Sequence, residues 1–206
     1  MPEADSNKLK SRRLDPAVRK HMILDKAAAL IAAEGLGAAS MERIGQEAGV
    51  SKTLVYAYFR NLSNLLQQLL LRDQRRLWEQ QTIAVSQADN FEELIRYTTR
   101  TYLQHVEQNG IHIQRLMSEP SLAAVFQERE RDGRQRVVDF LASEMARFCK
   151  VPRSVAILAT EVSMGMTGMA GELVSRGVVG SKKIEEIVLC LFHGSAAALS
   201  AKYGKD

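Results

Sequence analysis

The chain has 206 residues, of which 46% are hydrophobic and 25% are charged, and its formal net charge at pH 7 is +4. This composition excludes an intrinsically disordered chain, which would combine few hydrophobic residues with a high net charge. The longest apolar run, Ala27 to Ala33, is too short to cross a bilayer, and no apolar segment follows the first residue, so we expect neither a membrane span nor secretion.

The residue types favour helices. There are only four prolines and thirteen glycines, among many Ala, Leu, Glu, Gln and Arg residues. We therefore predict an all-α fold, with an N-terminal three-helix head and a larger helical body. Cys149 and Cys190 are isolated and lack metal-ligand spacing, which indicates reduced cytosolic thiols.

Positive charge is concentrated at the N-terminus. Residues 1–60 carry ten Lys and Arg against seven Asp and Glu, so most of the excess lies there. The first 14 residues are polar and include Arg12 and Arg13. This basic arm could follow phosphates or enter a minor groove, and the equal alternative is a solvated tail.

The first predicted helix begins at Asp15-Pro16, an N-cap followed by a proline suited to the first helical position. It continues to about Glu34, with Ile23, Ala27, Leu30 and Ile31 on one face, and Gly35 ends it. We expect this helix to pack across two shorter ones and complete the head.

A helix-turn-helix is predicted next. Ser40 can cap a short helix over residues 40–47, Gly49 suits a left-handed turn, and Ser51 can cap a second helix. The inward stripe is Leu54 or Val55 with Tyr58 and Phe59. The side chains left pointing outwards, with groups suited to phosphate and base contacts, are Ser51, Lys52, Thr53 and Tyr56. An ordinary helical hairpin remains the alternative on spacing alone.

Residues 40–66 resemble the DNA-binding signature of the tetracycline-repressor (TetR) family of bacterial transcription regulators. The matching runs are Ser40, Ile44-Gly45-Gln46-Glu47-Ala48-Gly49-Val50-Ser51, Tyr56-Ala57-Tyr58-Phe59 and Leu65-Leu66. Two positions depart from the pattern: Thr53 stands where Gly is common, and Leu62 where a phosphate-binding Lys is common. We assign DNA binding to Arg12, Arg13, Ser40, Arg43, Ser51, Lys52, Thr53, Tyr56 and Tyr58.

Asn61 can cap a helix that continues to about Val85, roughly 35 Å at 1.5 Å per residue. Such a helix would belong to the head at one end and to the body at the other, and could carry a change of shape between them. The next helix is predicted to begin at Phe91 and to end at Asn109-Gly110. A short apolar segment up to Met117 follows it. Another helix follows from Leu122, irregular near Gly133 and ending at Lys150-Val151-Pro152.

The last two predicted helices, over 154–174 and 182–203, are apolar almost all round and should be buried on both sides. Gly165, Gly168, Ala170 and Gly171 form a small-residue surface on the first of them. We expect the two helices to make a twofold four-helix interface, as the resemblance also implies. The candidate interface residues are Gly165, Gly168, Met169, Leu191 and Ala198.

No pattern points to catalysis or a metal, because the four histidines lack carboxylate neighbours at ligand spacing. We predict no enzyme, no metal and no cofactor. The resemblance favours a small-molecule pocket in the body, where apolar and polar side chains could combine. The candidate pocket residues are Trp78, Tyr102, His105, His112, Arg115, Met117, Phe126, Glu161 and Met164, although for each residue taken singly a core or surface role is the better interpretation.

These observations predict a flexible arm over residues 1–14, a DNA-binding domain over 15–60, and an effector-binding and dimerisation domain over 61–206. The function is that of a homodimeric repressor in the bacterial cytoplasm, on the nucleoid when bound to DNA, which an unknown small-molecule effector releases from a palindromic operator. The alternatives are a DNA-binding regulator without a ligand, and a helical interaction module or enzyme that mimics the motif.

Overall fold

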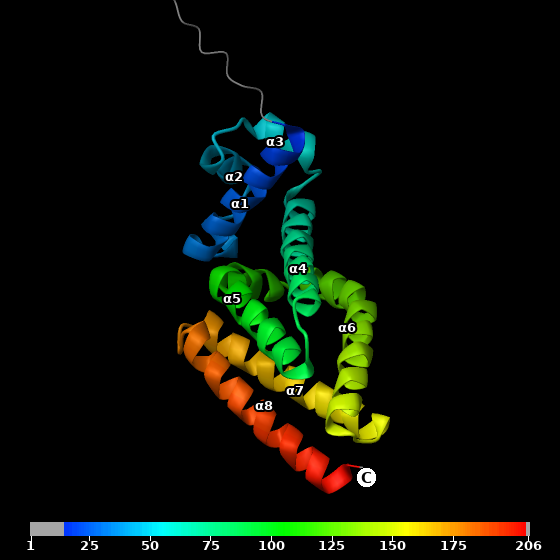
Figure 1. Ribbon diagram of the computed structural model, residues 1–206. Coiled ribbons are helices and arrows are strands. Elements are labelled where there is room, and N and C mark those ends of the chain that lie inside the picture. Colours follow the sequence, from blue (N-terminus) through cyan, green and yellow to red (C-terminus); the bar gives the residue numbers. More distant parts are fainter. Residues whose placement is uncertain (1–14, 205–206) are drawn as a thin grey trace, which may run out of the picture.

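The structure is a computed structural model and describes residues 15–204, with the backbone alone for residues 125–132. Within that range the chain is helical and has no strand, which confirms the all-α prediction. The helices are α1 (Pro16–Glu34), a 3-10 turn (Leu36–Ala38), α2 (Met41–Glu47), α3 (Lys52–Tyr58), α4 (Leu62–Ser86), α5 (Phe91–Met117), α6 (Pro120–Cys149), α7 (Arg153–Ser175) and α8 (Ser181–Tyr203). Figure 1 shows α1 to α3 gathered at one end, with α4 connecting them to α5 to α8.

The predicted capping residues begin the first four α-helices. Each side-chain oxygen accepts a backbone N–H of the first turn, at 2.8 Å for Asp15, 3.1 Å for Ser40, 3.2 Å for Ser51 and 2.8 Å for Asn61. Gly35 ends α1 with φ of 94°, and Gly49 makes the turn after α2 with φ of 64°. Only glycine adopts such angles without steric cost, so these two positions fix where the helices of the head end.

The predicted end at Gly110 is wrong, because α5 passes through it without a break, and α6 is also continuous at Gly133, where we expected an irregular helix. A Cβ on Gly110 would lie 2.8 Å from the Cβ of Ser175, at the end of α7. A Cβ on Gly133 would lie 2.5 Å from the ring of Trp78 on α4. Both glycines therefore permit close packing inside the body. The short apolar piece expected before Met117 is the last part of α5.

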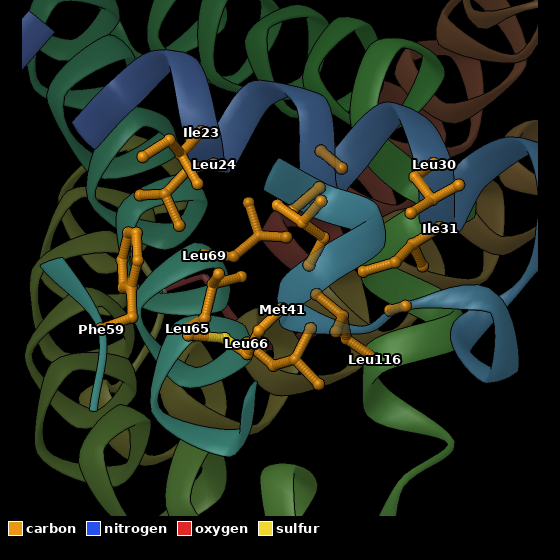
Figure 2. Close-up of a cluster of buried hydrophobic side chains, with 14 of the residues drawn as sticks. Ile23, Leu24, Leu30, Ile31, Met41, Phe59, Leu65, Leu66, Leu69 and Leu116 are labelled. Carbon is orange, nitrogen blue, oxygen red and sulfur yellow. The ribbon is translucent and has the colours of Figure 1, made fainter. Parts of the chain in front are cut away.

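The head has a core that continues into the body. Its buried members come from α1, α2 and α3 and from the first half of α4, but also include Leu116 of α5 and Leu122 of α6. Figure 2 shows Leu116 in the same cluster as Ile31, Met41 and Leu66. Because the apolar contacts are continuous from head to body, the head is attached to the body through α5 and α6 as well as through α4.

Two further buried clusters hold the body together. One joins the start of α5 to the ends of α6 and α8 and the start of α7, around Phe91, Met145 and Phe192. The other joins the middle of α5 to α7 and α8, around Leu103, Ala170 and Val188. Helices α7 and α8 lie side by side in Figure 1 and pack against α5 on their inner side.

Candidate nucleic-acid interface and its junction with the body

Helices α2 and α3 approach closely around Gly45. A Cβ added there would lie 3.1 Å from the carbonyl oxygen of Val50 and 3.2 Å from Cγ2 of Val55. The left-handed backbone at Gly49 reverses the chain between the two helices. The result is the helix, tight turn and second helix of a helix-turn-helix, in which α3 is the helix that enters a major groove.

The two faces of α3 differ as predicted. Val55 and Phe59 have no exposed surface, whereas Ser51, Lys52 and Thr53 are exposed and the side chain of Tyr56 is 49% exposed. Hydroxyl and ammonium groups thus stand on the outer surface of the head, where DNA could reach them. Whether each of them contacts DNA stays a prediction.

Tyr58 occupies an intermediate position. Its side chain is half-buried and packs against the head core, with its ring centroid 6.4 Å from that of Phe59. Part of this ring therefore stabilises the head. Its assignment to DNA contact stays a prediction, as does that of Arg12 and Arg13, which lie outside the described residues.

Carboxylates hold two of the candidate cations. Lys52 Nζ lies 3.3 Å from Glu42 Oε2, and Arg43 forms ion pairs with Glu34 at 2.9 Å and Glu47 at 3.1 Å. All these side chains are more than 40% exposed, and exposed pairs contribute only about 0–1 kcal/mol. A phosphate could therefore replace any of these three carboxylates at little cost.

Leu62, the departure at the start of α4, packs against the head core and is half-buried. Arg60 stands two residues earlier, is exposed, and makes no ion pair with any residue in the described part of the chain. The sequence assignment left Arg60 out. Because Leu62 stands where a phosphate-binding Lys is common, the sequence already indicated that a nearby cation such as Arg60 could bind that phosphate instead.

Three candidate pocket residues lie at the junction of head and body. His112 on α5 is buried, and its Nε2 lies 2.7 Å from Oδ2 of Asp73, which is 1% exposed. Since an ionised carboxylate only accepts, His112 is the donor. Burial alone would raise the pKa of Asp73, but the hydrogen bond from His112 and the charge of Arg72 outweigh burial and hold this pKa below its usual value.

The second and third are Arg115 and His105. Arg115 donates hydrogen bonds to the backbone oxygens of Ile31 and Ala32, the latter at 3.0 Å, in the last turn of α1. A cation there also complements the negative end of the helix dipole. His105 is buried on the same face of α5 as His112, two turns earlier, and burial is the main reason that its pKa lies below the usual value.

The other pocket candidates are spread over the body. Trp78 covers Gly133, Tyr102 covers Gly171, Glu161 pairs with Arg134, and Met117 packs against the head core. Met164 is half-buried on α7, and the side chain of Phe126 lies outside the described residues.

Two surface grooves lie on the body. One, of about 210 Å³, is bordered by His105 together with Gln80, Ile83, Thr101, Gln104 and Gln108. The other, of about 420 Å³, lies between α5 and the start of α8, and none of the nine candidates borders it. The pocket assignment as a whole therefore stays a prediction. Among the described residues no three His, Cys, Asp or Glu side chains gather as a metal site would require.

The outer faces of α7 and α8 carry apolar side chains without cover from the same chain. Leu158, Val162 and Met169 on α7 and Ile187 and Leu191 on α8 are between 43% and 75% exposed. Gly165, Gly168 and Gly194 share these faces, and a Cβ on any of them would meet nothing within 4 Å. Ala170 and Gly171, by contrast, are buried against the body's own core, so they do not belong to the small-residue surface expected there.

Helix α8 is also the one helix in the described part of the chain that is long and apolar enough to cross a membrane. This criterion uses length and composition only. Helices of soluble proteins that are covered by other helices meet it as well, so it does not by itself place α8 in a bilayer.

Comparison with known proteins adds to this geometry. The family described as bacterial regulatory proteins, tetR family, matches residues 23–69, which are the head from the middle of α1 into α4. No curated protein matches the sequence.

Solved structures resemble the whole chain. A TetR-like transcriptional regulator from Rhodococcus sp. RHA1 is 20% identical, with a TM-score of 0.73 over 90% of this chain and 100% of that one. The fatty acid degradation regulator of Bacillus halodurans is 18% identical, with a TM-score of 0.67 over 87% and 96%. A TetR-family regulator from Streptomyces coelicolor is 18% identical, with a TM-score of 0.67 over 89% and 97%.

At such identities these likenesses establish the fold. The family match adds the DNA-binding head, whose motif, caps and turn stand where the sequence indicated. TetR-family proteins are soluble cytoplasmic transcription regulators and not enzymes, and they typically bind DNA operators as homodimers. Residues 23–69 thus match the DNA-binding region of the TetR family, and the whole chain has the fold of solved TetR-family regulators.

Proposed function

We propose that the protein is a homodimeric repressor whose two α3 helices read the half-sites of a palindromic operator. The observation that carries this proposal is the division of α3 and its C-cap into a buried side, with Val55 and the C-cap Phe59, and an exposed side, with Lys52 and Tyr56. In this proposal residues 15–60 bind DNA and residues 61–206 dimerise and respond to an effector.

The uncovered apolar faces support dimerisation through α7 and α8. On α7 the spacing of Leu158, Val162, Gly165 and Met169 places all four on one side of the helix. On α8 Ile187, Leu191, Gly194 and Ala198 follow the same spacing. A second copy of the chain, related by a twofold axis, would bury both stripes in a four-helix interface.

Arg60 completes the proposed DNA contact. It follows α3 directly and precedes the capped start of α4, where backbone N–H groups of a helix N-terminus attract phosphate. Because Leu62 faces the head core, Arg60 supplies the cation on this side of the head. Arg60→Ala should therefore weaken binding to operator and to other DNA alike.

The body is the proposed site of effector binding. The groove beside His105 lies between α4 and α5, the helices that also contact the head. A ligand that preferred one arrangement of these helices would shift the equilibrium between operator-binding and free states. A screen of metabolites for thermal shift and for release of bound operator tests this part, and a DNA-binding protein that no metabolite releases would be a regulator without a ligand.

Gel shifts on operator fragments test the main proposal. DNA fragments selected by the wild-type protein should bind with affinity that falls steeply as salt rises, because phosphate contacts release counterions. Lys52→Ala and Tyr56→Ala should weaken or abolish operator binding while circular dichroism and dimer mass stay unchanged. Loss of folding together with binding would show a structural role for these side chains, and salt-independent binding would refute the proposal.

A further inference from the structure

A buried chain of polar contacts runs from the body to the first helix of the head. Asp73 accepts from His112 of α5 through Oδ2, at 2.7 Å, and from Arg72 Nε through Oδ1, at 3.0 Å. Arg72 Nη1 in turn donates to Asp25 Oδ1 at 2.7 Å and to the backbone oxygen of His21 at 3.3 Å. Both of these acceptors belong to α1.

The four side chains that make these polar contacts differ in burial. Asp73, His112 and Arg72 are each less than 9% exposed, whereas the side chain of Asp25 is 56% exposed. Arg76 also lies near this group, with Nη1 3.6 Å from Asp25 Oδ1 and 3.9 Å from Asp73 Oδ1. The carboxylate of Asp73 is therefore an acceptor that donors of α5 and α4 share.

A second attachment holds the C-terminal end of α1. Arg115 of α5 donates to the carbonyls of Ile31 and Ala32, and Ile31 lies ten residues beyond His21 and six beyond Asp25. Six to ten residues of α-helix span roughly 9–15 Å. Two directional contacts separated by this length fix the direction of a helix axis, whereas the apolar core beneath it tolerates sliding because hydrophobic contact has no direction.

We infer that Asp73 positions the DNA-binding head, acting through Arg72 and α1, and so sets the separation of the two recognition helices in the dimer. This inference rests on the proposed function, since it concerns operator binding by a dimer. Replacing both partners of a buried ion pair by apolar side chains often has little net effect on stability, because desolvation offsets the attraction, whereas removing one partner leaves a buried charge and destabilises the fold. The consequence that we infer for the ion pair of Asp73 and Arg72 is the orientation of the head, which can be measured as the preference of the dimer for one half-site spacing.

The test uses the full-length protein and three matched variants, Asp73→Asn, Asp25→Asn and Asp89→Asn. All three remove one negative charge. The first two break the contacts of Arg72 at its body and head ends, and the third lies in the connection between α4 and α5. Gel shifts measure each protein on an operator selected by the wild type, on the same operator with one base pair added or removed between half-sites, and on non-operator DNA of equal length.

Asp73→Asn and Asp25→Asn should lower the preference for the selected spacing by about fivefold or more, the size of a typical coupling between sites. Affinity for non-operator DNA should stay unchanged or rise, because a carboxylate has been removed from the head or its junction. Asp89→Asn should keep the wild-type preference. A purely structural role would instead lower the melting temperature and weaken binding to all three DNA probes together.

If Asp73→Asn fails to fold, Asp25→Asn decides the outcome, because Asp25 is the exposed member of these contacts. Asp25→Asn that folds, dimerises and keeps the full preference for spacing overturns the inference alone. A wild-type protein that selects no operator overturns the proposed function and this inference with it.

Discussion

Leu191→Ala tests whether the outer faces of α7 and α8 join two chains. Leu191 is 54% exposed, and full burial of a leucine contributes about 1.5–3 kcal/mol, so covering its exposed half contributes about 1 kcal/mol. A twofold interface contains the residue twice, which gives about 2 kcal/mol. At 1.4 kcal/mol for each factor of ten, dimer affinity should fall about 30-fold.

Sedimentation equilibrium over a range of protein concentrations measures this change directly. Leu191→Glu should act more strongly, since it places a charge with no partner in the same interface. Ile83→Ala is the matched control, because Ile83 is 56% exposed on α4, away from these two faces. If Leu191→Glu leaves the dimer intact, or if Ile83→Ala weakens it equally, the assignment of the interface to α7 and α8 is wrong.

Three other changes test separate contacts. Gly110→Ala should lower the melting temperature by a few degrees. Its methyl group would overlap the Cβ of Ser175 at a cost of about 1–3 kcal/mol, which exceeds the gain in helix propensity of about 1 kcal/mol. An unchanged or higher melting temperature would mean that α5 and α7 separate freely. Glu42→Gln should raise operator affinity up to about fivefold by releasing Lys52, and no change at low salt would show that the pair does not compete with DNA. The pKa of His105 is lowered in the folded state, so the unfolded chain takes up a proton first as pH falls below 6.5, and the free energy of unfolding should drop there. Denaturant unfolding at pH 7.5 and pH 5.5 should show a smaller drop for His105→Gln than for the wild type. An equal drop would assign the effect to another group.

The head could be predicted from the sequence because its determinants are local. Ser40, Ser51 and Asn61 each accept from a backbone N–H three residues ahead, and Gly49 sets its own turn. No distant residue is needed to place these helix ends. The bounds of the helices in the first third of the chain were accordingly expected within a residue or two.

Gly110 and Gly133 show where local reasoning fails. A glycine near the end of an apolar pattern is ordinarily a helix terminus, and Asn109 before Gly110 strengthened that reading. The structure uses both glycines inside helices, where Ser175 and Trp78 approach too closely for a side chain. The partner of Gly110 is 65 residues away in sequence, so nothing within its own segment could have indicated the contact.

The junction was hidden for the same reason. Arg72 and Asp73 read as a polar interruption in an amphipathic helix, and a solvated face was the natural expectation for them. Their burial follows from partners 39 to 51 residues away, His112, Asp25 and His21. The sequence placed His112 and Arg115 among the candidate pocket residues, but it could not indicate that their partners lie in the protein.

The two kinds of contact at this junction have different consequences for regulation. The shared apolar cluster keeps α1 attached to α4, α5 and α6 in any arrangement that leaves its side chains buried. The contacts of Arg72 and Arg115 are satisfied in only one orientation, because a guanidinium donates along fixed directions. A small shift of α5 against α4 would therefore break the polar contacts before it exposed the core. That order would allow a change in the body to turn the head without unfolding it, which a regulator released from DNA by a ligand requires.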